Sequence, residues 1–385
     1  MSKFIKFLSF VFAILLIVEF IPTAVSAKND YSNVNSSLIS TSAQSSILLD
    51  VSDDSVLYAK NADLRLPMAS TTKIMTALIA LEYGNIDTQY AIPQKAVGVE
   101  GSSVYLVEGE PLTLGELVYA LMLESANDAA EAIAIIIAGS TEAFADIMNR
   151  RAEELELHST HFTNPHGLDH DEHYTTAYDL ARLASFAIKN PKFREIVSTR
   201  KTTIPFNGDE GRRLLVNHNR LLREYRGAIG VKTGFTKRSG RCLVSAAERD
   251  GLTLVAVTIN APNDWHDHTA MLDWGFENYV HYVLSDVGEY KLTMPVTGGN
   301  TQWTICTNTQ KICVTLKSGH GPISTEVIAP HFIYAPIQQA QTVGKLIYKC
   351  DGEIIGESIL QTTTHVQVQN AKKGFWQWLR SLFRF

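Results

Sequence analysis

The segment Ser70-Thr71-Thr72-Lys73-Ile74-Met75-Thr76-Ala77-Leu78-Ile79-Ala80-Leu81 joins two reactive side chains to an apolar helix. Apolar residues recur at helical spacing from residue 74 onward, which predicts a helix that begins near Ser70. Residues three apart on a helix share one face, so Ser70 and Lys73 are expected to lie together. A serine hydroxyl becomes a good nucleophile when a base takes its proton. Lysine can be that base if burial, a second cation and the helix N-terminus lower its pKa.

The same four-residue pattern occurs again at residues 198–201, and we interpret that copy as chance. Thr202, Thr203 and Pro205 follow it and predict an extended or turning chain rather than a helix. Ser70, which precedes a predicted helix, is therefore the predicted nucleophile rather than Ser198.

A second motif, Ser125-Ala126-Asn127, lies between two predicted helices. The first begins at a capping-box pattern over residues 113–116, and the second is a nearly all-apolar run over residues 129–138. A loop held between two helices can present the Ser125 hydroxyl and the Asn127 amide to a cleft. Either residue alone could equally be a helix cap.

A third motif, Lys232-Thr233-Gly234, lies on a predicted strand over residues 227–235. The lysine offers a cation to a substrate carboxylate and the threonine offers a hydroxyl, while the glycine lets a ligand approach the strand closely. Two further strands are predicted at residues 241–246 and 252–257, the second after the hairpin signal Asp250-Gly251. An antiparallel sheet with flanking helices follows from this order.

Taken together and in this order, the three motifs resemble the set used by penicillin-recognising serine enzymes. Further stretches are similar to the serine-type D-alanyl-D-alanine carboxypeptidases, the low-molecular-mass penicillin-binding proteins, and most like their Gram-positive and sporulation-associated members. The similarity extends over about residues 35–365, and the additional stretches are residues 160–168, 173–181, 230–236 and 273–276.

The resemblance implies a role for each motif residue. Ser70 would attack the carbonyl between the two terminal D-alanines of a peptidoglycan stem peptide, with Lys73 as base and Ser125 as proton relay. Asn127 would hold the acyl side chain. Lys232, Thr233 and Gly234 would bind the substrate, the first two at its terminal carboxylate. The backbone N–H groups of Ser70 and Phe235 would form an oxyanion hole, and β-lactams would acylate Ser70.

One departure from some family members concerns the terminal carboxylate. Those members carry an arginine after the Lys-Thr-Gly strands, whereas residues 260–271 contain none. Lys232 and Thr233 would then do most of this work, with Arg241 as a candidate helper.

The predicted fold class is α+β, with the antiparallel sheet and helices of the DD-peptidase and β-lactamase type in the catalytic domain. That domain is expected over residues 46–282, after a flexible leader at 28–45. Short Thr- and Val-rich segments predict a small all-β domain over residues 283–370.

Both ends of the chain point to a membrane. Residues 1–27 have a basic start, an apolar run and a small-residue site at Val25-Ser26-Ala27, which predicts a cleaved export signal. An uncleaved anchor is the alternative. Residues 371–385 predict an amphipathic helix that lies in the membrane interface, with seven apolar residues on one half of the helical wheel. Packing on the protein is the alternative there. These features predict an exported protein on the outer face of the cytoplasmic membrane.

The net charge and the composition argue against several other classes of function. The net charge is −6, and removal of residues 1–27 would leave 32 Lys and Arg against 39 Asp and Glu, or −7, which argues against nucleic-acid binding. No cofactor is expected, and His266 and His268 are too closely spaced for the usual helical metal pair. Cys306 and Cys313 flank a possible hairpin that could carry a disulfide, with independent thiols as the alternative.

Three functions remain open. The first is the carboxypeptidase. The second is a related hydrolase, either an endopeptidase that cuts cross-links or a β-lactamase-like enzyme, although the sequence shows no glutamate clearly placed to activate a deacylating water. The third is a non-catalytic wall-binding protein on the same fold.

Overall fold

The structure is a computed structural model that describes residues 39–207 and 211–369. The predicted export signal and the predicted amphipathic tail therefore lie outside the described residues. None of the described helices is long and apolar enough to cross a membrane.

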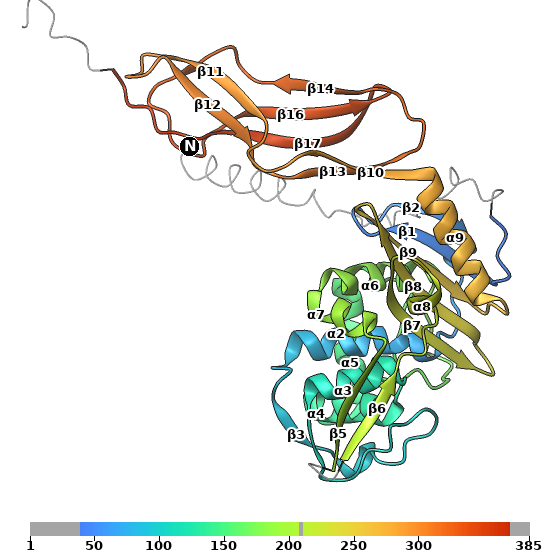
Figure 1. The fold of residues 1–385 in the computed structure, drawn as a ribbon. Helices are drawn as coiled ribbons and strands as arrows, with labels where there is room; N and C mark the ends of the chain where they lie inside the picture. Colours follow the sequence, from blue (N-terminus) through green and yellow to red (C-terminus); the bar gives the residue numbers. More distant parts are fainter. Residues whose placement is uncertain (1–38, 208–210, 370–385) are drawn as a thin grey trace, which may run out of the picture. The chain divides into compact units, whose positions relative to one another are not determined.

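A five-stranded antiparallel sheet with the strand order β2-β1-β9-β8-β7 forms the centre of the catalytic domain (Figure 1). β1 and β2 form an antiparallel pair, and the three predicted strands near residues 227–257 become β7, β8 and β9. The α+β prediction is confirmed. The strands are β1 (Ser45–Asp50), β2 (Val56–Lys60), β7 (Ala228–Thr236), β8 (Gly240–Arg249) and β9 (Leu252–Ile259).

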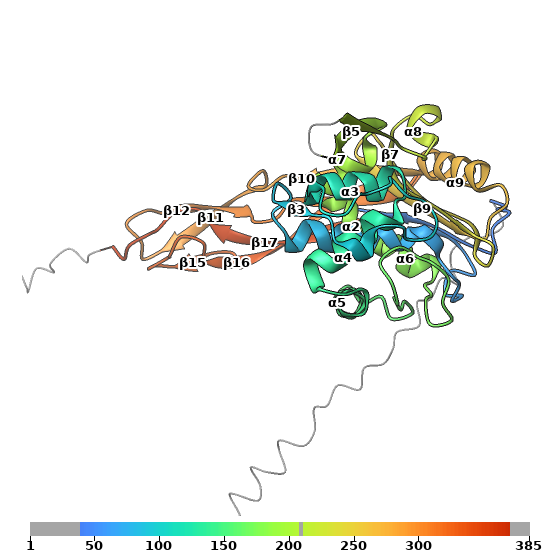
Figure 2. The same cartoon turned by 90° about the horizontal axis from the view of Figure 1, so that it is seen from below.

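Helices cover both faces of this sheet because its strands are apolar on both sides. On one face α9 (Asp264–Asn278) packs Met271 and Leu272 against Leu48 and Leu254. On the other face α6 (Ala177–Lys189) contacts β1 and β9, and α2 (Lys73–Tyr83) packs beside it. Figures 1 and 2 show the remaining helices gathered around α2. They are α3 (Leu114–Leu123), α4 (Asn127–Ala138), α5 (Thr141–Glu154) and α7 (Pro191–Ser198).

The helix boundaries follow local sequence signals. Thr113 and Glu116 form the predicted capping box at the start of α3, and Thr176 caps α6 by accepting from the Asp179 N–H. Gly139 ends α4 in the left-handed conformation. Short elements complete the domain: η1 (Ala69–Thr72), β3 (Gln89–Ala91), η2 (Gln94–Ala96), β4 (Pro111–Thr113), β5 (Lys201–Phe206), β6 (Gly211–Val216) and α8 (Leu221–Glu224).

The predicted C-terminal β domain is also present. Its main sheet has the order β14-β16-β17-β12-β11-β15, and a smaller sheet pairs β10 with β13. Leu346 and Leu360 are fully buried in its core beside Cys306. The strands are β10 (Tyr279–Ser285), β11 (Lys291–Thr297), β12 (Trp303–Asn308), β13 (Ile312–Lys317), β14 (Ile323–Ile328), β15 (Ile333–Tyr334), β16 (Thr342–Cys350) and β17 (Glu353–Thr362).

Two predicted boundaries need correction. The division between residues 282 and 283 falls inside β10, whose partner β13 belongs to the β domain. Residues 39–45 of the predicted leader belong to the catalytic domain, because Ile39 packs into its core and Ser45 begins β1. The Ser- and Asn-rich composition concealed this contact.

The possible hairpin between Cys306 and Cys313 is also corrected. β12 pairs with β11 and β17, whereas β13 pairs with β10, so the two cysteines lie in different sheets. Cys306 is buried, Cys313 is exposed, and both are free thiols.

Candidate active site

Ser70 lies in η1, the short turn that leads directly into α2. The preceding residue, Ala69, has a positive φ of 48°, a conformation that costs a non-glycine residue about 1–2 kcal/mol. Such strain persists where surrounding contacts fix the backbone, and it is common at active sites. The turn presents Ser70 at the N-terminus of an otherwise buried helix.

Lys73 is completely buried and meets three oxygen atoms. Its Nζ donates to Ser70 Oγ at 3.0 Å, to Asn127 Oδ1 at 2.6 Å and to the carbonyl oxygen of His166 at 2.6 Å. The predicted nucleophile and base are therefore in direct contact, which is the geometry that general-base activation requires.

The electrostatic surroundings suit Lys73 to this role. Burial lowers the pKa of Lys73 well below its ordinary value, and the charge of Lys232 lowers it further against the opposing effect of Asp128. Burial disfavours the ammonium form because the charge loses its hydration. Burial and the neighbouring Lys232 thus both favour the neutral amine that a general base needs.

The second motif also reaches Lys73. Asn127 is the first residue of α4, and its side chain is held at both ends, by Lys73 and by the carbonyl oxygen of Glu100 at 2.6 Å. The alternative that Asn127 caps a helix is wrong, because the cap position is Ala126. Ser125 is buried in the connecting turn with φ 60°, and its proton-relay role stays a prediction.

The third motif lies on β7, the last strand of the sheet, beside η1. Gly234 comes so close that an added Cβ would be 3.0 Å from the backbone nitrogen of Ser70. Lys232 is buried, and its Nζ donates to the Thr233 carbonyl at 2.9 Å. Burial lowers the pKa of Lys232 to about 7. Phe235 follows with an exposed side chain, and its backbone N–H stays a predicted oxyanion donor.

A loop at residues 163–168 completes the site, and sequence reasoning missed its role. Asn164 Oδ1 accepts from the Gly167 N–H at 2.7 Å and shapes the loop. Two successive carbonyls then face α2, because Pro165 O accepts from Thr76 and His166 O accepts from Lys73. The sequence feature that could have revealed this role is the polar turn Asn-Pro-His-Gly at residues 164–167, which lies in one of the stretches that resemble the family.

His173 links the loop at residues 163–168 to the turn that carries Ser70. Its Nδ1 accepts the Thr163 N–H at 3.0 Å, so its Nε2 carries the proton and donates to Thr72 Oγ1 at 2.8 Å. Thr72 Oγ1 in turn donates to the carbonyl of Ala69. Burial lowers the pKa of His173 to about 3, so the ring is neutral.

Two lesser predictions can now be placed. Arg241 pairs with the buried carboxylate of Asp264 at 3.0 Å, so its guanidinium already has an anionic partner. In the second Ser-x-x-Lys copy, Ser198 ends α7 and Lys201 begins β5, so the two do not share a helix.

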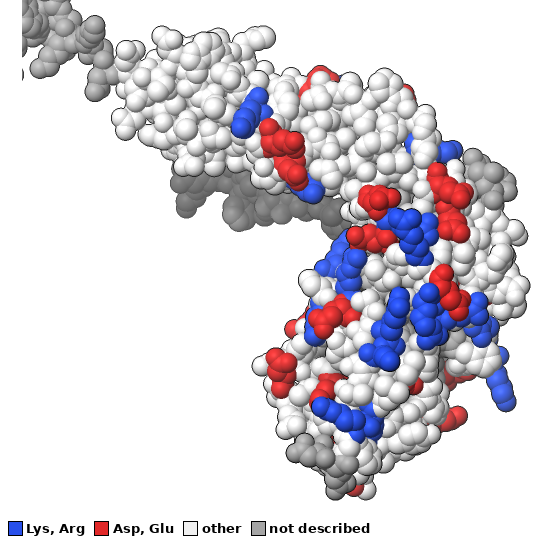
Figure 3. Space-filling model, viewed as in Figure 1, with Lys and Arg blue, Asp and Glu red and all other residues white. Residues whose placement is uncertain are grey.

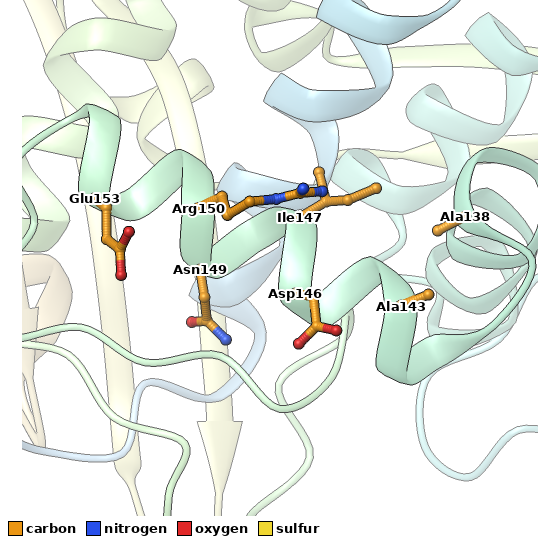
Figure 4. Close-up of a pocket in the computed structure, with 7 residues that line it drawn as sticks. All are labelled: Ala138, Ala143, Asp146, Ile147, Asn149, Arg150 and Glu153. Carbon is orange, nitrogen blue, oxygen red and sulfur yellow. The ribbon is translucent and has the colours of Figure 1, made fainter.

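Within the described residues, neither a metal cluster nor the pocket on α5 competes with this site. Within residues 39–207 and 211–369, no group of three His, Cys, Asp or Glu side chains is arranged to hold a metal ion. His268 instead lies between the hydroxyls of Ser245 and Thr258. A shallow pocket of about 570 Å³ is lined mainly by α5 and contains none of the motif residues (Figure 4).

Comparisons with known proteins identify the family of this chain. The family model described as D-alanyl-D-alanine carboxypeptidase, peptidase S11, matches residues 31–263, and the penicillin-binding protein 5 C-terminal domain matches residues 287–370. The D-alanyl-D-alanine carboxypeptidase DacF of Bacillus subtilis is 34% identical over 354 residues, which cover 89% of this chain and 90% of the relative.

Two Gram-negative proteins extend the comparison. The D-alanyl-D-alanine carboxypeptidase DacA of Escherichia coli is 29% identical over 81% of each chain. The crystal structure of penicillin binding protein 5 from Haemophilus influenzae superimposes with a TM-score of 0.71 at 26% identity, covering 85% of this chain and 98% of the other. The chain therefore belongs to the peptidase S11 family of D-alanyl-D-alanine carboxypeptidases, and it is a serine DD-carboxypeptidase.

Proposed function

We propose that this chain is an exported DD-carboxypeptidase that removes the terminal D-alanine from peptidoglycan stem pentapeptides through an acyl-enzyme on Ser70. The observation that carries the proposal is the 3.0 Å contact between Lys73 Nζ and Ser70 Oγ, made by a lysine whose pKa is lowered by burial. Family membership supplies the substrate class.

The first half of the reaction forms the acyl-enzyme. Ser70 Oγ attacks the carbonyl carbon between the two D-alanines while its proton passes to Lys73 Nζ. The C–N bond then breaks, and the proton passes through Ser125 to the leaving amine, which departs as D-alanine. The backbone N–H groups of Ser70 and Phe235 stabilise the oxyanion.

The second half is hydrolysis. Water attacks the ester carbon, and the bond between that carbon and Ser70 Oγ breaks. One proton of the water returns to Ser70 Oγ through the same groups, and the shortened peptide leaves with a new terminal carboxyl group. In the bound substrate the terminal carboxylate meets Lys232 and Thr233, and Asn127 contacts the acyl side chain. β-Lactams enter the same site as substrate mimics and acylate Ser70.

Intact-protein and peptide mass spectrometry test this proposal together. The wild-type protein with a pentapeptide stem should remove one alanine, and penicillin should add its full mass to Ser70. Ser70→Ala should do neither. An unlabelled wild-type protein that leaves the pentapeptide whole would overturn the proposal.

The related hydrolases are separated by product and by adduct lifetime. A cross-linked dimer that is cleaved while the pentapeptide stays whole would indicate an endopeptidase. Glu131 lies on α4 with Asn127, but its carboxylate accepts from Thr141 and is 4.0 Å from His166 Nε2. We therefore expect a persistent penicilloyl adduct rather than the rapid turnover of a β-lactamase. A deletion phenotype fully rescued by Ser70→Ala would instead favour a non-catalytic wall protein.

The proposed location is the outer face of the cytoplasmic membrane, with the signal removed and residues 371–385 as a peripheral anchor. The composition of the two ends supports it. Truncation after residue 370 should move the mature protein to the soluble fraction. A truncated protein that stays in the membrane fraction would contradict the tail as the anchor.

A further inference from the structure

One end of the β domain exposes a group of apolar side chains on the outward face of its main sheet. β11 buries Met294 and Val296, so Pro295 between them faces outward. Strand pairing places Trp303 of β12 opposite Pro295 on one side. On the other side β15 pairs Ile333 with Val296, so Phe332 and Tyr334 also face outward.

These side chains are exposed rather than packed. The exposed fractions are 58% for Trp303, 45% for Phe332 and 68% for Tyr334, and the two latter rings contact each other at 5.3 Å. Ile305, two residues along β12 from Trp303, is 46% exposed on the same face. We call Trp303, Ile305, Phe332 and Tyr334 the aromatic patch.

The sequence segments that carry the aromatic patch contain no charged residue. Residues 292–310, 327–344 and 358–371 contain no Lys, Arg, Asp or Glu, although 19% of the chain is charged. At the chain's average these segments would hold about ten charged residues. Figure 3 shows the end of the domain at β11 and β12 without charged side chains on the visible face, and charged residues begin further along.

The chain also leaves the domain at this end. The Gln369 N–H donates to the carbonyl of Gly298 at 2.8 Å, and the Asn300 N–H donates to the carbonyl of Gln367. Gly298 and Asn300 belong to the turn between β11 and β12, immediately before Trp303. The described part of the chain therefore ends beside the aromatic patch, and in the sequence it is followed by residues 371–385, which include seven large apolar residues.

We infer that the aromatic patch is a second membrane contact, which inserts into the lipid headgroup region alongside the tail. Trp and Tyr favour this region because their rings are apolar and their N–H and O–H groups can stay hydrated. The absence of charge over these segments removes the large cost of transferring ions from water into a low-dielectric layer. A protein partner would also use aromatic residues, but the adjoining start of the tail favours lipid.

Two attachments on one molecule should bind more strongly than either alone, because the second becomes intramolecular. The inference rests on the proposed membrane location but not on catalysis. The tail alone would let the domain tumble, whereas the tail and the patch together would fix the end of the β domain against the surface.

Vesicle flotation tests this inference with protein comprising residues 28–385 and vesicles of equal phosphatidylglycerol and phosphatidylethanolamine. We expect Trp303→Ser/Phe332→Ser/Tyr334→Ser to raise the lipid concentration for half binding about tenfold or more. The matched control is Val287→Ser/Ile354→Ser, two β-domain residues exposed by 65% and 59%, which should bind as the wild type does. Equal binding by the triple variant and the wild type would overturn the inference.

A direct measurement protects the result against misfolding of the triple variant. Brominated lipids should quench Trp303 as well as Trp376 and Trp378 of the proposed anchor, and Trp303→Phe should remove only the share of the quenching that comes from Trp303. Unchanged quenching in Trp303→Phe, or binding of an apolar dye to the patch only after residues 371–385 are removed, would show that lipid does not cover the patch. If only tail truncation lowers flotation, the patch inference fails and the anchor stands. If only the patch variant lowers it, the anchor fails.

Discussion

A Cβ atom on Gly167 would lie 1.9 Å from the carbonyl oxygen of Ala69, the residue before the nucleophile. Gly167 has φ 90° and therefore occupies a position that favours glycine for two reasons, its backbone conformation and its close approach. Ala69 has a strained backbone and directly precedes Ser70. A displacement of its carbonyl oxygen would therefore also shift Ser70. The loop at residues 163–168 thus sets the position of the nucleophile as well as that of Lys73.

We expect Gly167→Ala to slow penicillin acylation of Ser70 by at least about a hundredfold, equivalent to about 2.7 kcal/mol in the barrier. The matched control is Gly139→Ala, which has a similar φ of 83° and nothing within 4 Å of the added Cβ. Both substitutions place a Cβ on a residue with positive φ, but only Gly167→Ala would displace Ala69. The measurement is the acylation rate with fluorescent penicillin, and equal rates in the two variants would exclude a positioning role.

His173 is predicted to act as a positioning residue through Thr72. Replacement by alanine removes the donor to Thr72 Oγ1 and the acceptor of the Thr163 N–H, so Ser70 should acylate about tenfold more slowly. Glutamine offers both a donor and an acceptor, and His173→Gln should recover part of the rate.

The pH profile separates this role from acid–base chemistry. Since the pKa of His173 is about 3, the ring is neutral throughout the working range, and the profile of His173→Ala should keep the shape of the wild-type profile at a lower level. A lost limb between pH 5 and 8 would mean that His173 exchanges protons with the reaction.

The residues that could be predicted from sequence are those whose chemistry is carried by a short local pattern. Ser70 and Lys73 share a helical turn, and Lys232 and Gly234 share a strand, so spacing alone places each pair. The three motifs then meet because α2 packs against α4 and the turn η1 packs against β7, which only the family resemblance could anticipate. The capping box at residues 113–116 was equally local and was predicted.

The missed features depend on contacts between distant segments. His166 contributes a backbone carbonyl, which any residue type could supply, so its identity gave no signal. The roles of Gly167 and His173 depend on Ala69 and Thr72, about a hundred residues earlier in the chain. The division at residue 282 was misplaced because strand pairing, rather than composition, assigns β10 to the β domain.

Loss of the proton from Lys232 should lower kcat/KM as the pH rises past neutral. Its pKa of about 7 means that the free protein loses this ammonium group as the pH rises through 7. Because the cation is proposed to bind the substrate carboxylate, kcat/KM should fall above pH 7. The fall should be weaker in kcat, since a bound carboxylate would raise the pKa of Lys232.

Lys232→Arg tests the origin of this limb. Arginine stays charged at every accessible pH, so the variant should lose the fall between pH 7 and 9 even if its overall rate is lower. The measurement is kcat/KM for D-alanine release across this range. The same falling limb in Lys232→Arg would assign it to another group.

A buried ion pair between Glu110 and Arg213 is predicted to hold the β5–β6 hairpin in place. The Arg213 guanidinium donates to both carboxylate oxygens, at 2.7 and 2.8 Å, and also to the carbonyls of Val104 and Pro205. The Glu110 side chain is fully buried. Burial opposes its ionisation, but the hydrogen bonds and the charge of Arg213 outweigh burial and lower its pKa.

Removal of one partner should be costly because it leaves the other group buried and unpaired. We expect Glu110→Gln to destabilise the catalytic domain by about 3–5 kcal/mol in denaturant unfolding at pH 7. Because the folded-state pKa of Glu110 lies below its ordinary value, its contribution is fully present above that value and is lost as the pH falls through the folded-state pKa. The stability of the wild type and that of Glu110→Gln should therefore converge in acid. A constant difference down to the lowest pH at which the domain folds would contradict an ionised Glu110 as the source of the stability.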